Sequence, residues 1–224
     1  MIAAGQPRSS PDVLGRLLHS LCQPLTSLRC SLELSLDESI ERQEQNIAVA
    51  LEQADRAIES VQLIREYLEL ERAPKPVQAV PVRPVVDAVL CQLSVVAEAH
   101  HIPLLASGTT TATLYVNEFW LQRALRYLIG TWLQGPVCNK AVVVVMEDGA
   151  SESSLSTYCL SSLYSDGLPS AARAIAGHLQ QARLAIAQRV LESAGASVEL
   201  SPDGKPAFVI RIPQAKTTLH KLSA

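Results

Sequence analysis

The sequence predicts an α+β protein in two parts: an antiparallel helical hairpin that dimerises into a four-helix bundle, followed by a two-layer α/β sandwich. Three observations of the 224-residue chain support this division. Leucines recur at helical spacing near the N-terminus, prolines cluster between residues 74 and 84, and short strand-like runs then alternate with helical segments. At 48% hydrophobic and 18% charged residues, the composition allows a buried core and excludes wholesale disorder.

The first part is expected to contain two long helices. Ser10-Pro11-Asp12 is typical of a helix start, because serine caps free amides and proline suits the first turn. The first helix carries leucines at positions 14, 17, 18, 21, 25, 28 and 32. After a break at 36–39, a second helix runs to about Arg72 with an apolar side of its own. A lone hairpin buries two apolar stripes poorly, so we expect a homodimer.

The second part follows a proline-rich connector, since prolines at this density stop a helix. We therefore predict a hairpin at 1–73, a linker at 74–81, an α/β domain at 82–215 and a tail at 216–224. The expected helices of the α/β domain are 82–100, 118–133 and 180–194, and its expected strands are 114–116, 141–146, 156–162, 197–200 and 207–212.

Charge and composition exclude several functional classes. A net charge of -3 without a basic stripe argues against nucleic-acid binding. The longest apolar run, at 141–146, is far shorter than the ~20 residues of a membrane span, and the N-terminus lacks the pattern of a signal peptide. Five scattered cysteines without a C-x-x-C pair indicate neither a zinc ribbon nor a disulfide framework. These features favour a cytoplasmic protein with no membrane contact.

A polar patch is expected around His19 on the first helix. At about 100° per residue, most of the leucines lie within about 40° of the direction of Leu14, whereas His19 lies about 140° from it. Arg16, Gln23 and Thr26 fall on the same outward side. An exposed imidazole is a competent nucleophile for a phosphoryl group, although an exposed histidine on an ordinary bundle gives the same pattern.

Pro24 lies about one turn after His19. It cannot donate a hydrogen bond to the carbonyl of Ser20, so we expect the helix to bend or loosen beside the histidine.

The segment His19-Ser-Leu-Cys-Gln-Pro-Leu-Thr26 resembles the H-box of bacterial sensor histidine kinases, typically His-Glu-Leu-Arg-x-Pro-Leu-Thr. The resemblance continues, in the order of that family, over about 200 residues. It includes the start of the ATP-binding domain (81–87), the N-box helix (115–128), the last helix (184–195) and the closing hairpin (197–213). It implies a dimerisation and phosphotransfer hairpin followed by a Bergerat-type sandwich, as in dimeric histidine phosphotransferases.

The nucleotide motifs of that family are altered in this sequence. Tyr127 and Thr131 stand where the N-box has asparagines, and a hydroxyl is a poorer magnesium partner than an amide carbonyl. Asp166 keeps the outline of the adenine-binding motif without its second glycine. Gln181 and Arg183 lie where three glycines normally approach the phosphates. We therefore expect that ATP and magnesium do not bind in the usual way, with an unusual anion at Arg183 or Arg173 as the alternative.

The H-box is altered too, because Ser20 replaces the acid that normally follows the histidine. The sequence therefore predicts a histidine phosphotransferase without a cofactor, in which His19 accepts a phosphoryl group from one response-regulator receiver domain and passes it to another. Arg16, Gln23 and Thr26 would form the docking rim, with Ser20 and Pro24 setting the local geometry. Three alternatives stay open: a non-catalytic pseudokinase that binds a regulator or kinase, a response-regulator phosphatase that uses Gln23, and a residual kinase.

Overall fold

The computed structural model describes residues 10–35, 40–72, 77–133, 140–161, 178–200 and 208–213. The chain divides into two compact units, one made of residues 1–74 with 175–186 and the other of residues 75–174 with 187–224. The first holds a helical hairpin and the second an α/β sheet domain, so the predicted fold class is confirmed.

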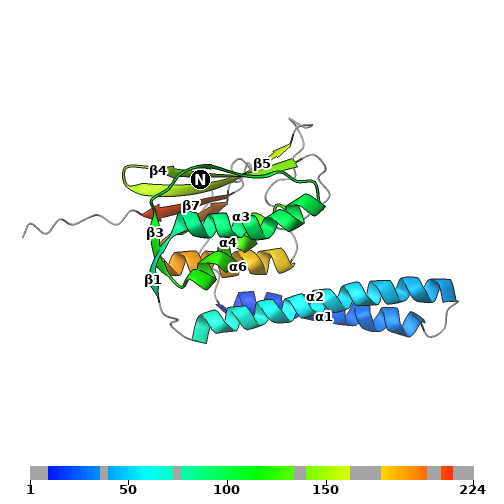
Figure 1. The fold of residues 1–224 in the computed structure, drawn as a ribbon. Coiled ribbons are helices and arrows are strands. Elements are labelled where there is room, and N and C mark those ends of the chain that lie inside the picture. Colours follow the sequence, from blue (N-terminus) through cyan, green and yellow to red (C-terminus); the bar gives the residue numbers. More distant parts are fainter. Residues whose placement is uncertain are drawn as a thin grey trace, which may run out of the picture. The chain divides into compact units, whose positions relative to one another are not determined.

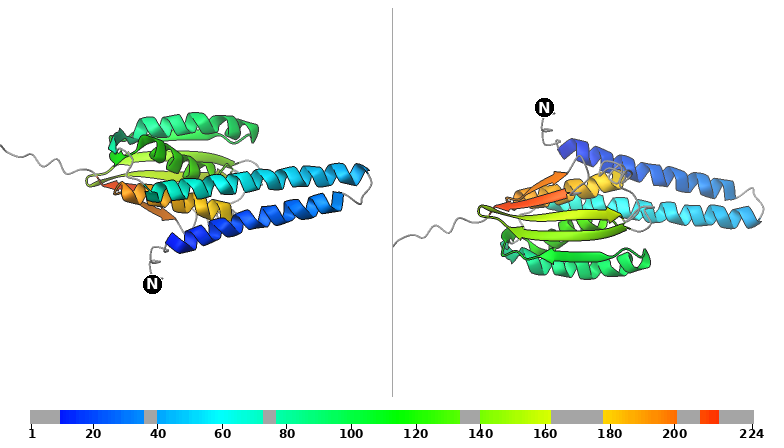
Figure 2. Two further views of the ribbon diagram at one scale, coloured as in Figure 1. Left: turned by 90° about the horizontal axis from the view of Figure 1, so that it is seen from below. Right: turned by 90° about the horizontal axis from the view of Figure 1, so that it is seen from above.

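The hairpin consists of α1 (Ser10–Ser35) and α2 (Ile40–Arg72), which lie side by side (Figures 1 and 2). The buried residues of these two helices include several serines and alanines as well as larger side chains. The buried residues are Leu17, Ser20, Pro24 and Ser35 of α1 and Ala50, Ala57, Ser60, Leu63 and Tyr67 of α2.

Most of the larger apolar side chains of the hairpin point away from this contact. Eight of them are between 43% and 63% exposed. Apart from Leu34, they recur at helical spacing along α1 and α2: Leu18, Leu25, Leu32, Ile47, Leu51, Ile58 and Val61. Part of this set lines a groove between the two helices, formed by Leu25, Leu28, Leu32 and Ile47 with Arg29 and Glu33 at its rim. We call the seven residues the apolar stripe of the hairpin.

The second unit is built on a five-stranded sheet with the order β2-β4-β5-β7-β6. Its strands are β2 (Leu104–Gly108), β4 (Lys140–Asp148), β5 (Glu152–Ser161), β6 (Ser197–Leu200) and β7 (Phe208–Pro213). β2 runs parallel to β4, and the other pairs are antiparallel. A separate two-stranded ribbon pairs β1 (Gln78–Pro81) with β3 (Thr113–Val116). The helices of this unit are α3 (Val82–Ala99) and α4 (Glu118–Gly130). The helix α6 (His178–Ser193) belongs to the first unit up to Ile186 and to the second from Ala187.

One face of the sheet carries the core. Alternate residues of the central strands are buried, as a two-residue period requires: Val142, Val144, Met146, Leu155, Phe208, Ile210 and Ile212. α3 and α4 lie on the same side of the sheet (Figure 1), and their buried residues include Val86, Val89, Leu121 and Leu125. The unit therefore has one layer of strands and one of helices.

Two strands and two element ends differ from the sequence prediction, one of the ends being the start of β5 at Glu152 rather than at residue 156. β1 falls in the range predicted as linker, and β2 was not predicted at all. Both are short and largely exposed, and proline or small residues replace the usual alternation. α4 ends at Gly130 rather than Leu133, because the chain then tightens into turns in which Trp132 donates to Ile129 and Leu133 donates to Gly130.

Across the described residues, no helix combines the length and apolar character that a bilayer span requires. In the same part of the chain, no three histidine, cysteine or acidic side chains come together as a metal site.

Candidate functional site

His19 is exposed on α1, and the helix places Gln23 and Thr26 one and two turns further along the same side. Both of these side chains are also exposed, so the three residues form one accessible row. The hydroxyl of Thr26 donates to the carbonyl of Cys22 at 2.9 Å, which ties this side chain to its own helix. Arg16 lies on α1 one turn before His19, and its side chain is outside the described set.

Ser20 faces the interior of the hairpin, although it adjoins His19 in the sequence. Its side chain is only 6% exposed, and its hydroxyl donates to the carbonyl of Leu17 at 2.7 Å. Ser20, which the resemblance aligns with the acid of the H-box, therefore presents no carboxylate at the surface beside the imidazole.

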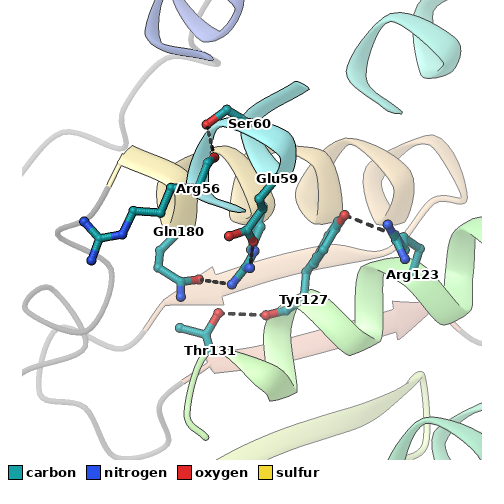
Figure 3. A network of polar contacts seen from close by, with 8 residues as sticks. Arg56, Glu59, Ser60, Arg123, Tyr127, Thr131 and Gln180 are labelled. Atoms are coloured by element: carbon teal, nitrogen blue, oxygen red, sulfur yellow. Dashed lines mark hydrogen bonds and ion pairs between the residues drawn. The ribbon is translucent and has the colours of Figure 1, made fainter. Parts of the chain in front are cut away.

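Ser60 of α2 is a neighbour of the site that the sequence reasoning missed. Its hydroxyl lies 3.3 Å from the carbonyl oxygen of Ser20 and 2.9 Å from that of Arg56, one turn earlier in α2. Figure 3 shows the second of these contacts. The sequence offered one signal for this contact, namely a serine in the second helix of a hairpin whose first helix contains Pro24.

Tyr127 and Thr131, which the resemblance aligns with the N-box asparagines, are hydrogen-bonded within α4 and its C-terminal turn. Thr131 donates its hydroxyl to the carbonyl of Tyr127 at 2.7 Å (Figure 3). The phenol oxygen of Tyr127 accepts from Nε of Arg123 at 3.1 Å, and the guanidinium carbon lies 5.3 Å from the centre of the ring. The polar atoms of this helix face thus form a local cluster.

The start of α6 carries bulky side chains where the resemblance leads us to expect glycines. Arg183 forms an ion pair with Glu59 of α2 within the first unit, and its Nη1 donates to Oε1 of Gln180 at 3.3 Å. Burial lowers the pKa of Arg183. Ala182 is buried and Gln181 is half-buried. Asp166 lies outside the described residues.

No family model and no curated protein matches the chain by sequence. Solved structures match it well. The histidine kinase AdeS of Acinetobacter baumannii superposes with a TM-score of 0.61 at 15% identity, over 87% of this chain and 97% of that one. ThkA in complex with the response regulator protein TrrA superposes with a TM-score of 0.64 at 12% identity, over 94% of this chain and 64% of ThkA. Full-length ShkA in complex with AMPPNP superposes with a TM-score of 0.51 at 15% identity, over 92% of this chain and 46% of ShkA.

The chain has the histidine kinase fold. The match includes the helical hairpin as well as the sheet domain, because the superpositions with AdeS and ThkA cover most of this chain. At these identities the likeness concerns the arrangement of helices and strands, and the chemistry of the site is argued from the side chains.

Proposed function

We propose that this protein is a histidine phosphotransferase of a two-component phosphorelay, in which His19 exchanges phosphoryl groups with the aspartates of receiver domains and ATP takes no part. The observation that carries the proposal is the exposure of His19 on α1, beside the turn interrupted by Pro24, in a chain with the histidine kinase fold. A receiver domain needs such an accessible imidazole to bring its aspartyl phosphate into line with a ring nitrogen.

The proposed step conserves the phosphoryl group. A ring nitrogen of His19 attacks the phosphorus of the receiver's aspartyl phosphate, the P–O bond to the aspartate breaks, and the carboxylate leaves with the bonding pair. The other ring nitrogen then releases its proton to water. A second receiver reverses these events on its own aspartate. The magnesium and acidic cluster that assist the transfer belong to the receiver in this proposal.

Gln23 and Thr26 form the docking rim beside His19, together with Arg16. The exposure of Gln23 and Thr26 on one side of α1 supports this role, since a partner that reaches the imidazole must cover the neighbouring turns. The solved complex of ThkA with TrrA supports a response regulator as partner, because this fold binds one there.

The absence of ATP chemistry is supported by the donor set of α4 and α6. Magnesium prefers carboxylate, carbonyl and water oxygens, whereas this helix face offers Tyr127 and Thr131 already engaged with each other and with Arg123. A nucleotide phosphate needs open backbone amides, whereas the start of α6 carries the side chains of Gln180 and Arg183. These residues do not fit a magnesium nucleotide, so no step of the proposal passes through one.

A homodimer is part of the proposal. The apolar stripe of the hairpin exposes seven large aliphatic side chains on a fold whose hairpin can form half of a four-helix bundle. The groove lined by Leu25, Leu28, Leu32 and Ile47 is complementary to a helix with the same composition, which a second copy supplies.

The experiment uses a receiver domain phosphorylated with a small-molecule donor such as acetyl phosphate, mixed with the full chain. We expect acid-labile, base-stable label on the wild-type protein and none on His19→Ala. His100→Ala is the matched control, because His100 is also exposed but follows α3 in the other unit, and it should keep its label. Label that persists on His19→Ala, or is absent from the wild type, contradicts the proposal.

One observation favours a second candidate, a non-catalytic module that binds a regulator. The inward hydroxyl of Ser20 leaves His19 without the adjacent carboxylate of an H-box. This candidate predicts that the wild type and His19→Ala bind a receiver domain equally well, and that neither takes up label.

A further inference from the structure

Pro24 removes one hydrogen bond from the interior of α1. A helix normally pairs each amide with the carbonyl four residues earlier, and proline has no amide hydrogen to donate. The carbonyl of Ser20 therefore receives nothing from position 24. Ser20 is buried against α2, and a buried carbonyl without a donor is unfavourable.

Ser60 offers the missing donor from the other helix. It is fully buried, and its hydroxyl lies within hydrogen-bond distance of the carbonyls of both Ser20 and Arg56. A hydroxyl carries one proton and serves one of them at a time. The carbonyl of Arg56 already accepts the backbone amide of Ser60 inside α2, whereas the carbonyl of Ser20 lacks its helical donor.

We propose that Ser60 is a positioning residue for His19, because it replaces the hydrogen bond that Pro24 withholds and so fixes the turn that carries the imidazole. This inference rests on the proposed function at His19. The contact acts on the residue that directly follows the histidine, and it ties that turn to α2. A loosened turn changes the angle at which the ring meets the partner's phosphorus, and small misplacements at a reacting atom slow a transfer strongly.

The test is a double-mutant cycle on the rate of transfer from a phosphorylated receiver domain. Ser60→Ala should slow transfer about ten-fold in the natural Pro24 background. In the Pro24→Ala background the new amide at position 24 bonds the carbonyl of Ser20, so the same Ser60→Ala change should alter the rate less than about two-fold. An equal fall in both backgrounds means that Ser60 only packs the core, and no fall in the Pro24 background also overturns the proposal.

Two further variants separate the hydroxyl from its volume. Ser60→Cys keeps the size but donates poorly, and should be as slow as Ser60→Ala. Ser60→Thr keeps the donor and should retain most of the rate. If the added methyl group prevents Ser60→Thr from folding, as circular dichroism would show, the cycle with Pro24→Ala decides alone.

A spectroscopic measurement tests the contact without any transfer. The backbone carbonyl ¹³C resonance of Ser20 should move upfield in Ser60→Ala, because a carbonyl loses deshielding when it loses a hydrogen bond, and it should not move when Pro24→Ala is also present. An unchanged resonance in Ser60→Ala overturns the inference. No label on the wild-type chain refutes the proposed function whatever the resonance does, whereas label with an equal fall in both backgrounds refutes the role of Ser60 alone.

Discussion

The hydroxyl of Ser60 lies 3.3 Å from the carbonyl oxygen of Ser20, across the interface between α1 and α2. The contact occurs where Pro24 interrupts the hydrogen-bond ladder of α1, one residue from His19. The proline inside the candidate phosphoacceptor helix thus also leaves a carbonyl that can accept from the neighbouring helix. The local geometry of His19 depends on α2 as well as on its own helix.

Pro24→Ala should stabilise the hairpin. Proline inside a helix is about 3 kcal/mol less favourable than alanine, and loss of the buried ring offsets part of this gain. We expect a net gain of about 1 kcal/mol, or a rise in Tm of about 3 °C for a chain of this size. Pro84→Ala is the matched control, because Pro84 lies in the first turn of α3, where the amide has no acceptor within the helix. Thermal unfolding by circular dichroism compares them, and a fall in Tm for Pro24→Ala would contradict this view.

Ile58→Asp should convert the proposed homodimer to a monomer. Ile58 is 56% exposed within the apolar stripe, and a carboxylate there would be buried without a partner in a four-helix bundle. We expect the dissociation constant of the dimer to rise about a hundredfold or more. Light scattering coupled to size-exclusion chromatography gives the mass directly.

Val95→Asp is the control for that substitution. Val95 is 71% exposed on α3, outside the hairpin, so the same loss of an exposed apolar side chain should leave the dimer intact. A dimer that survives Ile58→Asp, or dissociates equally in both variants, would show that the stripe is not the dimer interface.

The sequence predicted the elements with strong periodicity and missed those whose structure depends on neighbours. The hairpin and the central strands follow from leucine spacing and from runs such as Ala141–Met146. β2 escaped prediction because its residues are mostly exposed at the sheet edge, where the parallel pairing with β4 supplies the order. The need for glycine at position 108 is visible only in the structure. The φ of Gly108 is 76°, and a Cβ there would collide with the carbonyl of Met146.

The candidate site divides in the same way. Helical spacing alone placed His19, Gln23 and Thr26 on one side of α1, and the structure has all three exposed. The inward direction of Ser20 and its contact with Ser60 required the register between two helices, which no single-helix pattern contains. Likewise, the resemblance aligns Tyr127 and Thr131 with the N-box asparagines, but the sequence does not show that the Thr131 hydroxyl bonds to the Tyr127 carbonyl.

The wild-type protein should show no saturable, magnesium-dependent binding of a fluorescent ATP analogue. Thr131→Asn restores one amide but should not restore binding, because Gln180 and Arg183 still occupy the start of α6. ShkA, which was solved with AMPPNP, is the positive control. Saturable binding to the wild type would contradict the proposal that ATP takes no part.

The carboxylate of Asp148 should make the α/β unit sensitive to acid. It accepts hydrogen bonds from the hydroxyls of Thr110 at 2.6 Å, Ser153 at 2.7 Å and Thr111 at 2.8 Å, and from the amide of Thr111 at 2.8 Å. These bonds, with that from Thr110 the largest contributor, hold the pKa of Asp148 well below its usual range. They link the β2–β3 connection to the β4–β5 hairpin.

Because the pKa of Asp148 is lower in the folded state, its stabilisation is fully present above the ordinary carboxyl pKa of about 4 and is lost as the pH falls through the lowered value. Asp148→Asn should therefore be less stable than the wild type at pH 7, with the difference shrinking as the pH falls below about 4. Urea unfolding at pH 7 and pH 3 measures both differences. Glu147→Gln removes the adjacent exposed charge without touching these hydrogen bonds, and should not reproduce the pattern. A difference between Asp148→Asn and the wild type that stays constant with pH would mean that the carboxylate acts through packing rather than through its charge.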